Sequence, residues 1–584
     1  MASTSAPPSK PDPPKRAPSY INFTPRRAMA SFENLVALAN YEEHLREARK
    51  MVWRDRGEPA VEVGDLGECI EHGLRGGLRA GAIAFTIRSG VNIILLLVRI
   101  RKIPRKYVLA VVRRAIFGED SFRAGAMLGC FVSLYRILLN AFPIIFPTNI
   151  PISTRLAELY AALRTGTLRG RILDAESALE DLESPTSSPE VSPVSRRNAH
   201  AHAHFAEPLA RPPRPPRESR LSMSAQAHQQ WVRKKTRRWH AVVAGAIAGG
   251  AAVLFEKRSR QTIISQQLFV RGLQGSYNAY SQRKGLRVPY GDVLVFALAC
   301  AQIMYGYLLR PETLPRSYIK WIDTASRLPP ETVAMNRDLA LTGKFNLKDL
   351  ETILETPYIA PRNATELAVK HMLGSANPPI WGYPNAPCLA SHPGVENCTD
   401  VPMDRFVSVF KWMFPIYGAL HLLPTLIFKP KAAVKTPLRT FMRAAWGTTR
   451  SSAFLGIFVV IYQAYFCGKV NASRVLADMG APIWLLRLVR SRASYYLGGF
   501  LAGLSLLVEA PRRRPELAMY VLPKGLESGW RVARGQGLVP NKTRYGEALL
   551  TAVGMGMVMS TYQNDPQHLS GLVRRVLYQF IGPN

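Results

Sequence analysis

The sequence lacks several features that define familiar classes of protein. It has only 6 cysteines in 584 residues, too few for a scaffold held together by disulfides. No apolar stretch follows the first methionine, so we do not expect a cleaved secretory signal. The chain shows no nucleophile elbow, phosphate-binding loop, dinucleotide fingerprint or zinc-protease motif. We therefore predict that it is not an enzyme and uses no cofactor.

Acidic residues are scarce as well. Their total of 41, against 76 Lys and Arg, gives a formal net charge of +35. In a soluble protein this balance would suggest nucleic acid as a partner. Here the basic residues gather beside long apolar runs, as at 99–114 and 429–443, which is typical of loops that meet lipid headgroups. The sequence favours a lipid bilayer as the partner and argues against nucleic acid.

The chain contains two related halves. Residues 244–277 align without a gap on the segment that begins at Leu497, an offset of 253, and the stretch from Tyr290 aligns on that from Tyr545 at an offset of 255. Upstream segments align at offsets of 329 and 327. The matched pairs include Gly245/Gly498, Gly250/Gly503, Leu254/Leu507 and Glu256/Glu509. This self-similarity predicts a tandem duplication in which the first copy carries about 74 additional residues.

Each half has four apolar segments, and roughly 20 helical residues are enough to cross the hydrocarbon core of a membrane. The segments are 77–100, 121–146, 239–255 and 291–309 in the first copy, and 406–428, 452–467, 494–508 and 546–562 in the second. The more polar stretches 261–275 and 515–530 are predicted to be helices in the membrane interface. Four crossings per copy would orient both copies the same way, and the orientation of the whole chain stays open.

These patterns predict an all-α, polytopic membrane protein with about eight membrane segments and with a disordered tail and linker. The Pro-rich start of the chain and the Pro-, Arg- and Ser-rich insertion are too poor in apolar residues to order themselves, whereas 31–56 has the spacing of a soluble helix. The expected organisation is an N-terminal tail and helix at 1–66, a first repeat at 67–322 with its insertion at 174–230, a connector at 323–396, a second repeat at 397–577 and a C-terminal tail at 578–584.

Glycines recur four residues apart in the apolar segments. In lipid, small residues at this spacing allow two helix backbones to approach closely. We predict helix packing at Gly125, Gly129, Gly245, Gly249, Gly499 and Gly503.

Carboxylates occupy matched places in the two copies. Glu256 and Glu509 end the third segments, and Asp292 and Glu547 begin the fourth segments. Such acids can be solvated caps that complement the helix dipole. Alternatively they line a polar pathway between the copies, because ionisable groups within a membrane mark such pathways.

The connector contains the spacing C-x3-H-x5-C, formed by Cys388, His392 and Cys398. Thiolate and imidazole ligands suit zinc, but a structural zinc site needs four ligands. Cys69 or His371 would be the fourth ligand. A disulfide and an ordinary turn are the alternatives, so the sequence predicts no established metal site here.

Three stretches carry a resemblance to a known family. They are P-C-x3-H-P-x3-N-C from Pro387, followed by F-V-S-V-F-K-W-M-F-P-I-Y-G-A-L-H from Phe406, and R-A-A-W-G-T-T-R-S-S-A-F-L-G-I-F from Arg443. The chain resembles the transmembrane protein 135 family over most of 67–577, apart from the insertion. That family is similar in turn to four-span mitochondrial preprotein translocase channels and a peroxisomal membrane protein.

The resemblance implies a multi-pass protein of an organelle membrane, peroxisomal in the first place and mitochondrial as the alternative. It implies roles in lipid handling and organelle dynamics, with organelle membrane proteins or a peroxisomal import receptor as partners, and it supplies no catalytic residues. We expect a scaffold or a conduit for lipid-like or small solutes. The alternative is a component or adaptor of organelle protein import. The oligomeric state is not predicted.

Overall fold

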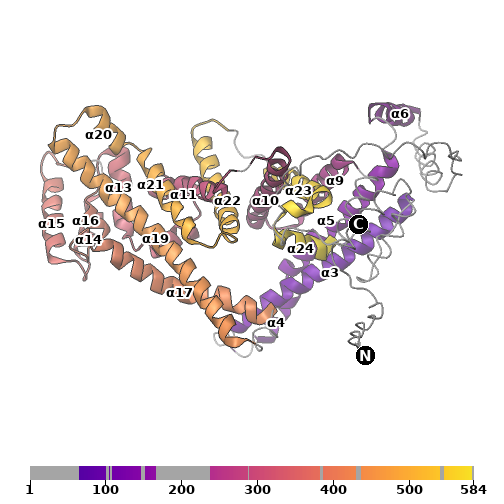
Figure 1. Ribbon diagram of the computed structural model, residues 1–584, viewed down its shortest axis with the longest axis horizontal. Helices are drawn as coiled ribbons and strands as arrows, with labels where there is room; N and C mark the ends of the chain where they lie inside the picture. Colours follow the sequence, from indigo (N-terminus) through magenta and orange to yellow (C-terminus); the bar gives the residue numbers. More distant parts are fainter. Residues whose placement is uncertain are drawn as a thin grey trace, which may run out of the picture. The chain divides into compact units, whose positions relative to one another are not determined.

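The structure is a computed structural model that describes residues 65–99, 104, 108–146, 152–165, 237–286, 288–381, 386–428, 436–539 and 545–581. Every element in these ranges is a helix, and none of them contains a strand (Figure 1). The all-α prediction is therefore confirmed. The predicted N-terminal helix within 31–56 and the insertion at 174–230 lie outside the described residues.

The described chain divides into two compact units, and their boundaries differ from those of the predicted repeats. One unit contains the described residues up to Lys257 together with those from Met555 onward, and the other is Arg258–Gly554. The first unit holds α3 (Leu66–Arg99), α4 (Val108–Ile116), α5 (Glu119–Ile145), α6 (Ile152–Thr165), α9 (Arg238–Ala252), η5 (Val253–Phe255), the part of α23 (Gly546–Asn564) from Met555 onward, η8 (Pro566–His568) and α24 (Gly571–Ile581).

The second unit contains the remaining helices. They are α10 (Arg258–Lys284), α11 (Gly291–Leu309), η6 (Pro311–Thr313), α12 (Arg316–Ser326), α13 (Pro330–Thr342), α14 (Leu347–Leu354), α15 (Pro361–Ser375), α16 (Cys388–Ser391), α17 (Val401–Phe428), α19 (Pro437–Asp478), α20 (Ile483–Arg490), α21 (Ser494–Gly503), η7 (Leu504–Val508) and α22 (Arg514–Gly535).

Five helical stretches are long and apolar enough to cross a membrane. They are Leu66–Leu97, Val108–Ile145, Arg238–Phe255, Gly291–Leu309 and Pro437–Asp478, and Ser494–Val508 is apolar but shorter. Their length and composition indicate a multi-pass membrane protein. All of these stretches lie in the part of the chain that the structure describes.

In the first unit, α3 packs along α5, and α9 packs on α5 (Figure 1). The α3–α5 contact is close because glycines face each other across it. A Cβ atom built on Gly81 would lie 3.0 Å from the Gly125 carbonyl oxygen, and one built on Gly129 would lie 3.1 Å from the Gly77 carbonyl oxygen. Only glycine at these places lets the two backbones come so near.

The second unit is arranged around α11 and α19. α17 packs along α19, and α11 packs against α21, η7 and α22 (Figure 1). Buried apolar side chains of α11, α17, α19 and α22 form one core, which includes Phe296, Val409, Phe454 and Ala518. The connector has a smaller core of its own, made by α13 to α16 and including Met335, Leu350 and Leu367.

The two segments predicted as the fourth of each repeat, α11 and α23, pack against helices that were predicted to belong to the other repeat. In α11, Ala297 approaches Gly503 of α21, and Ala299 approaches Gly525 of α22. In α23, Met559 approaches Gly245 of α9, while Gly554 approaches Phe269 of α10. This exchange of α11 and α23 is the reason why the compact units do not follow the predicted repeat boundaries.

Candidate functional site

Four side chains that can bind a metal come together in the second unit. Cys388 lies at the start of α16, His392 and Cys398 lie in the loop that follows, and Cys467 lies on α19. Their ligand atoms all lie within 4.8 Å of one another. Cys388 and His392 are buried, and the two other cysteines are half-buried.

The distances within this cluster are short. The Sγ atoms of Cys388 and Cys398 are 3.5 Å apart, and Cys398 Sγ lies 3.4 Å from His392 Nε2. The hydrogen bond with Cys467 and burial raise the pKa of the Cys388 thiol to about 12. Burial, with the neighbouring Cys388 adding to it, raises the pKa of Cys398 to about 11.

Hydrogen bonds hold the loop that contains His392 in place. His392 Nδ1 lies 2.8 Å from the Val395 carbonyl oxygen, so its N–H donates there and Nε2 faces the cysteines. Asn363 of α15, which is fully buried, donates to the carbonyl oxygens of His392, Pro393 and Val395 at 2.9–3.2 Å. These bonds set the position and the tautomer of the ring before any ligand binds.

The fourth member of the cluster is Cys467, which the sequence spacing did not suggest. Of the two predicted candidates, His371 pairs with Glu351 at 3.0 Å instead, and Cys69 lies buried in α3. Sequence spacing missed Cys467 because it lies 69 positions after Cys398 and the packing of α19 against the connector brings the two together.

Two of the four predicted carboxylates are buried. Glu256 follows η5 and is 5 % exposed, and Glu509 follows η7 and is 1 % exposed. Each side chain accepts the backbone N–H of the next residue, from Lys257 at 3.0 Å and from Ala510 at 2.9 Å. The two glutamates therefore have the same local geometry at the ends of matched helices.

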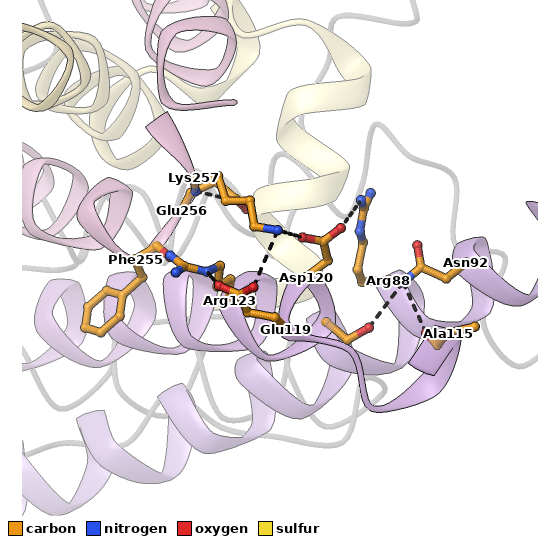
Figure 2. A network of polar contacts seen from close by, with 10 residues as sticks. Arg88, Asn92, Ala115, Glu119, Asp120, Arg123, Phe255, Glu256 and Lys257 are labelled. Carbon is orange, nitrogen blue, oxygen red and sulfur yellow. Dashed lines mark hydrogen bonds and ion pairs between the residues drawn. The ribbon is translucent and has the colours of Figure 1, made fainter. Parts of the chain in front are cut away.

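The residues around Glu256 form an ionic network at the start of α5 (Figure 2). Lys257 Nζ lies 2.9 Å from Asp120 and 3.6 Å from Glu119. Arg123 pairs with Glu119 at 2.7 Å and donates to the Phe255 carbonyl oxygen at 3.0 Å. The network ties the end of η5 to α5.

The residues around Glu509 join three helices. Ser451 of α19 donates to Glu509 at 2.6 Å, and Arg513 lies 3.9 Å from the same carboxylate. Arg513 also donates to Ser451 at 2.8 Å, while His421 of α17 lies 3.3 Å from the Ser451 hydroxyl. A carboxylate, a guanidinium, a hydroxyl and an imidazole thus meet in a largely apolar unit, which is a set of groups able to pass a proton or hold a polar solute.

Asp292 and Glu547 occupy a different kind of place. Both are half-buried in the first turn of their helices, α11 and α23. Asp292 accepts the N–H of Val293 at 3.0 Å, and Glu547 accepts the hydroxyl of Thr262 at 3.5 Å. These positions fit acids that complement the helix dipole.

The predicted packing glycines lie in helix contacts. Gly125 and Gly129 lie in the α3–α5 contact, Gly245 faces α23, and Gly499 and Gly503 face α11. Gly249 is buried in α9. Sequence reasoning missed Gly77 and Gly81, the partners of Gly125 and Gly129, although they have the same spacing of four.

Arg123 and Arg450 are further residues that sequence reasoning missed. Arg450 of α19 donates to the Val508 carbonyl oxygen, as Arg123 of α5 does to that of Phe255. Both acceptors directly precede the buried glutamates. The offset of 327 pairs the two arginines, so the alignment of the halves contained the signal that would have found them.

Comparisons with family models, with curated proteins and with solved structures find no match to this chain.

Proposed function

We propose that this multi-pass membrane protein is a conduit for small or lipid-like solutes in an organelle membrane. One observation carries the proposal: Glu256 and Glu509 are buried in matched settings, each at the end of a membrane-length or apolar helical stretch and each accepting the backbone N–H of the next residue. Removing charges from water is costly even when they are paired. Ionisable groups that persist inside a membrane protein usually line the route of an ion or solute.

The proposal includes a duplicated architecture with eight crossings. The order of elements supports it, since α9, η5, α10, α11, η6 and α12 are followed later by α21, η7, α22, α23, η8 and α24 in the same order and with similar types. The arginine-to-carbonyl bonds before Glu256 and Glu509 support it independently. The packing of α11 and α23 against helices of the other copy would then hold the two copies together.

The organelle is part of the same proposal. The resemblance to the transmembrane protein 135 family suggests a peroxisomal membrane first and a mitochondrial one as the alternative, with a role in lipid handling. Tagging the full chain and comparing its position with markers of both organelles tests this. Extraction with alkaline carbonate tests membrane insertion, and we expect the protein to stay in the pellet.

Transport is tested with the purified full chain in liposomes. We expect leakage of small polar solutes or exchange of labelled lipid above that of protein-free vesicles. The double variant Glu256→Gln and Glu509→Gln should lower this flux about tenfold, because the carboxylates no longer carry charge. The matched control is Asp292→Asn with Glu547→Gln, which should keep flux within about twofold if these acids only complement helix dipoles.

Retained helical circular dichroism must accompany each result. Flux equal to that of empty vesicles for the wild-type chain, together with binding of organelle precursor peptides, would reject the conduit and favour protein import. Unchanged flux in the Glu256→Gln and Glu509→Gln variant would remove the two glutamates from the route.

A further inference from the structure

We propose that Cys388, His392, Cys398 and Cys467 bind one zinc ion in a tetrahedral site that fastens the connector to α19. The proposal is independent of the conduit. It rests on four donors from two separate parts of the chain whose ligand atoms all lie within 4.8 Å of one another. Three sulfurs and one imidazole nitrogen form one of the usual ligand sets of structural zinc.

The spacing of the donors fits a tetrahedron around zinc. Zinc–sulfur bonds of about 2.3 Å place two sulfurs of a tetrahedral site roughly 3.8 Å apart, with a slightly shorter sulfur–nitrogen edge. The observed separations are 3.5 Å between Cys388 Sγ and Cys398 Sγ and 3.4 Å between Cys398 Sγ and His392 Nε2. Small side-chain adjustments would bring all four donors to bonding distance.

The surroundings of His392 have the form that metal-binding histidines usually have. A histidine ligand normally donates its second ring N–H to a carbonyl or carboxylate, which orients the other nitrogen toward the metal. His392 does this through the Val395 carbonyl oxygen at 2.8 Å. The buried side chain of Asn363 then holds that loop through three donated hydrogen bonds.

A basic group next to the site suits its charge. Binding of Zn²⁺ by three cysteines and one histidine releases three thiol protons and leaves the site with one net negative charge. Arg405 at the start of α17 donates to the Ser391 carbonyl oxygen at 3.4 Å, and its side chain is 12 % exposed. The guanidinium therefore lies beside the residue that precedes His392, and its positive charge, shared with Asp404 at 3.6 Å, offsets part of the negative charge.

The site explains how the connector is attached to the membrane helices. α13 to α16 form their own small core, and the loop after α16 carries three of the ligands. Cys467 comes from α19, which has 42 residues and a length of about 63 Å, well beyond the roughly 30 Å of hydrocarbon. The extra length of α19 would carry Cys467 toward the connector, and the metal would link the two.

The alternative is a disulfide between Cys388 and Cys398. It would consume two of the three sulfurs and would leave Cys467 and the oriented His392 without a role. The two chemistries differ in metal content and in thiol reactivity, so one preparation of the protein separates them.

The test measures zinc in the full chain, purified in detergent without chelator. We expect about one zinc per chain in the wild type and less than about a fifth of that in Cys467→Ser. The control is Cys130→Ser, which changes a half-buried cysteine of α5 outside the cluster and should keep full zinc. His392→Cys should retain metal as a four-cysteine site, whereas His392→Ala should lose most of it.

Two more readouts keep the proposal testable if Cys467→Ser fails to fold. Cobalt exchanged into the wild-type protein should give the visible bands of tetrahedral thiolate coordination. Removal of zinc by a strong chelator should expose the connector to protease while leaving the membrane helices protected. The proposal would be overturned by a folded wild-type protein that contains no zinc or that contains iron instead. It would also be overturned if Cys388 and Cys398 react with thiol reagents only after the protein has been reduced, as expected for a disulfide.

Discussion

Arg123 and Arg450 show how single side chains close the ends of buried helices. The last carbonyl groups of a helix have no partner within it, and both arginines donate to such a carbonyl just before a buried glutamate. A charged donor to a buried acceptor contributes more than a neutral one. Because the same arginine-to-carbonyl hydrogen bond occurs at both places, we infer that it stabilises both helix ends.

Substituting these arginines tests that role. Arg450→Met should lower stability by about 1–3 kcal/mol, because the Val508 carbonyl loses a charge-assisted hydrogen bond. Arg123→Met should lower it less, because the bond from Arg123 to the Phe255 carbonyl oxygen is exposed to solvent. Thermal unfolding in detergent, followed by circular dichroism, measures both, and an unchanged melting temperature in both variants would contradict the argument.

Lys469 is a second residue whose energetics can be predicted. Its side chain is buried in α19, 5 % exposed, and its Nζ has no hydrogen-bond partner among the described residues. It lies 3.4 Å from the centre of the Tyr495 ring, which offsets part of the cost of burying a charge.

Lys469→Met keeps most of the volume and removes the charge. We expect the free energy of unfolding to rise by about 1–3 kcal/mol, seen as a higher melting temperature in detergent. A large fall in stability would mean that the charge is balanced by a group that the described contacts do not contain. In that case Lys469→Arg should preserve stability better than Lys469→Met.

At the scale of helices, small residues decide which elements pack closely. α3 and α5 touch through Gly77, Gly81, Gly125 and Gly129, where a Cβ atom would meet the backbone of the facing helix at 2.7–3.1 Å. Backbone atoms cannot move aside as a flexible side chain can. The helix pair therefore depends on these glycines.

The same helix offers a matched control. Gly81→Leu should separate α3 from α5 and lower the free energy of unfolding by about 1–3 kcal/mol or more. Gly90→Leu, in α3 but with no atom within 4 Å of a new Cβ, should keep or raise stability by up to about 1 kcal/mol. Equal melting temperatures of the two variants in detergent would show that the glycines are not responsible for the close contact.

At the scale of the molecule, the exchanged helices join sequence regions that the predicted repeats keep apart. α23 packs on α9 from the first copy, and α11 packs on α21 and α22 from the second. Small residues face each other at both places. Helix pairing therefore does not follow order along the chain: α11 packs against Gly499 and Gly503 of α21, and Gly556 of α23 packs against Val242 and Ala246 of α9.

Crosslinking tests this exchange in the intact protein. In Val242→Cys with Gly556→Cys, a short thiol crosslinker should join the two positions, because a Cβ on Gly556 would lie 3.5 Å from Val242 Cγ1. Mass spectrometry of the linked peptides identifies the product, and absence of this link in the folded protein would mean that α23 does not pack on α9.

Local patterns in the sequence were enough for part of this picture. Apolar run lengths predicted membrane helices because the cost of an unsatisfied backbone in lipid acts on each segment separately. The spacing of Gly125 and Gly129 and the matched acids Glu256 and Glu509 were also visible, because repetition and periodicity are properties of the chain itself. The eight-segment count goes further than the five stretches that meet the criteria of length and composition.

The all-α, membrane-length character of the chain was thus determined by its sequence alone. Only the tertiary structure decided that Cys467 joins Cys388, His392 and Cys398, that Arg123 and Arg450 reach the carbonyls before the buried glutamates, and that α11 packs on α21 and α22 while α23 packs on α9. Each of these depends on contacts between residues tens to hundreds of positions apart. Such contacts are selected by the fit of whole helix surfaces, and no local pattern records that fit.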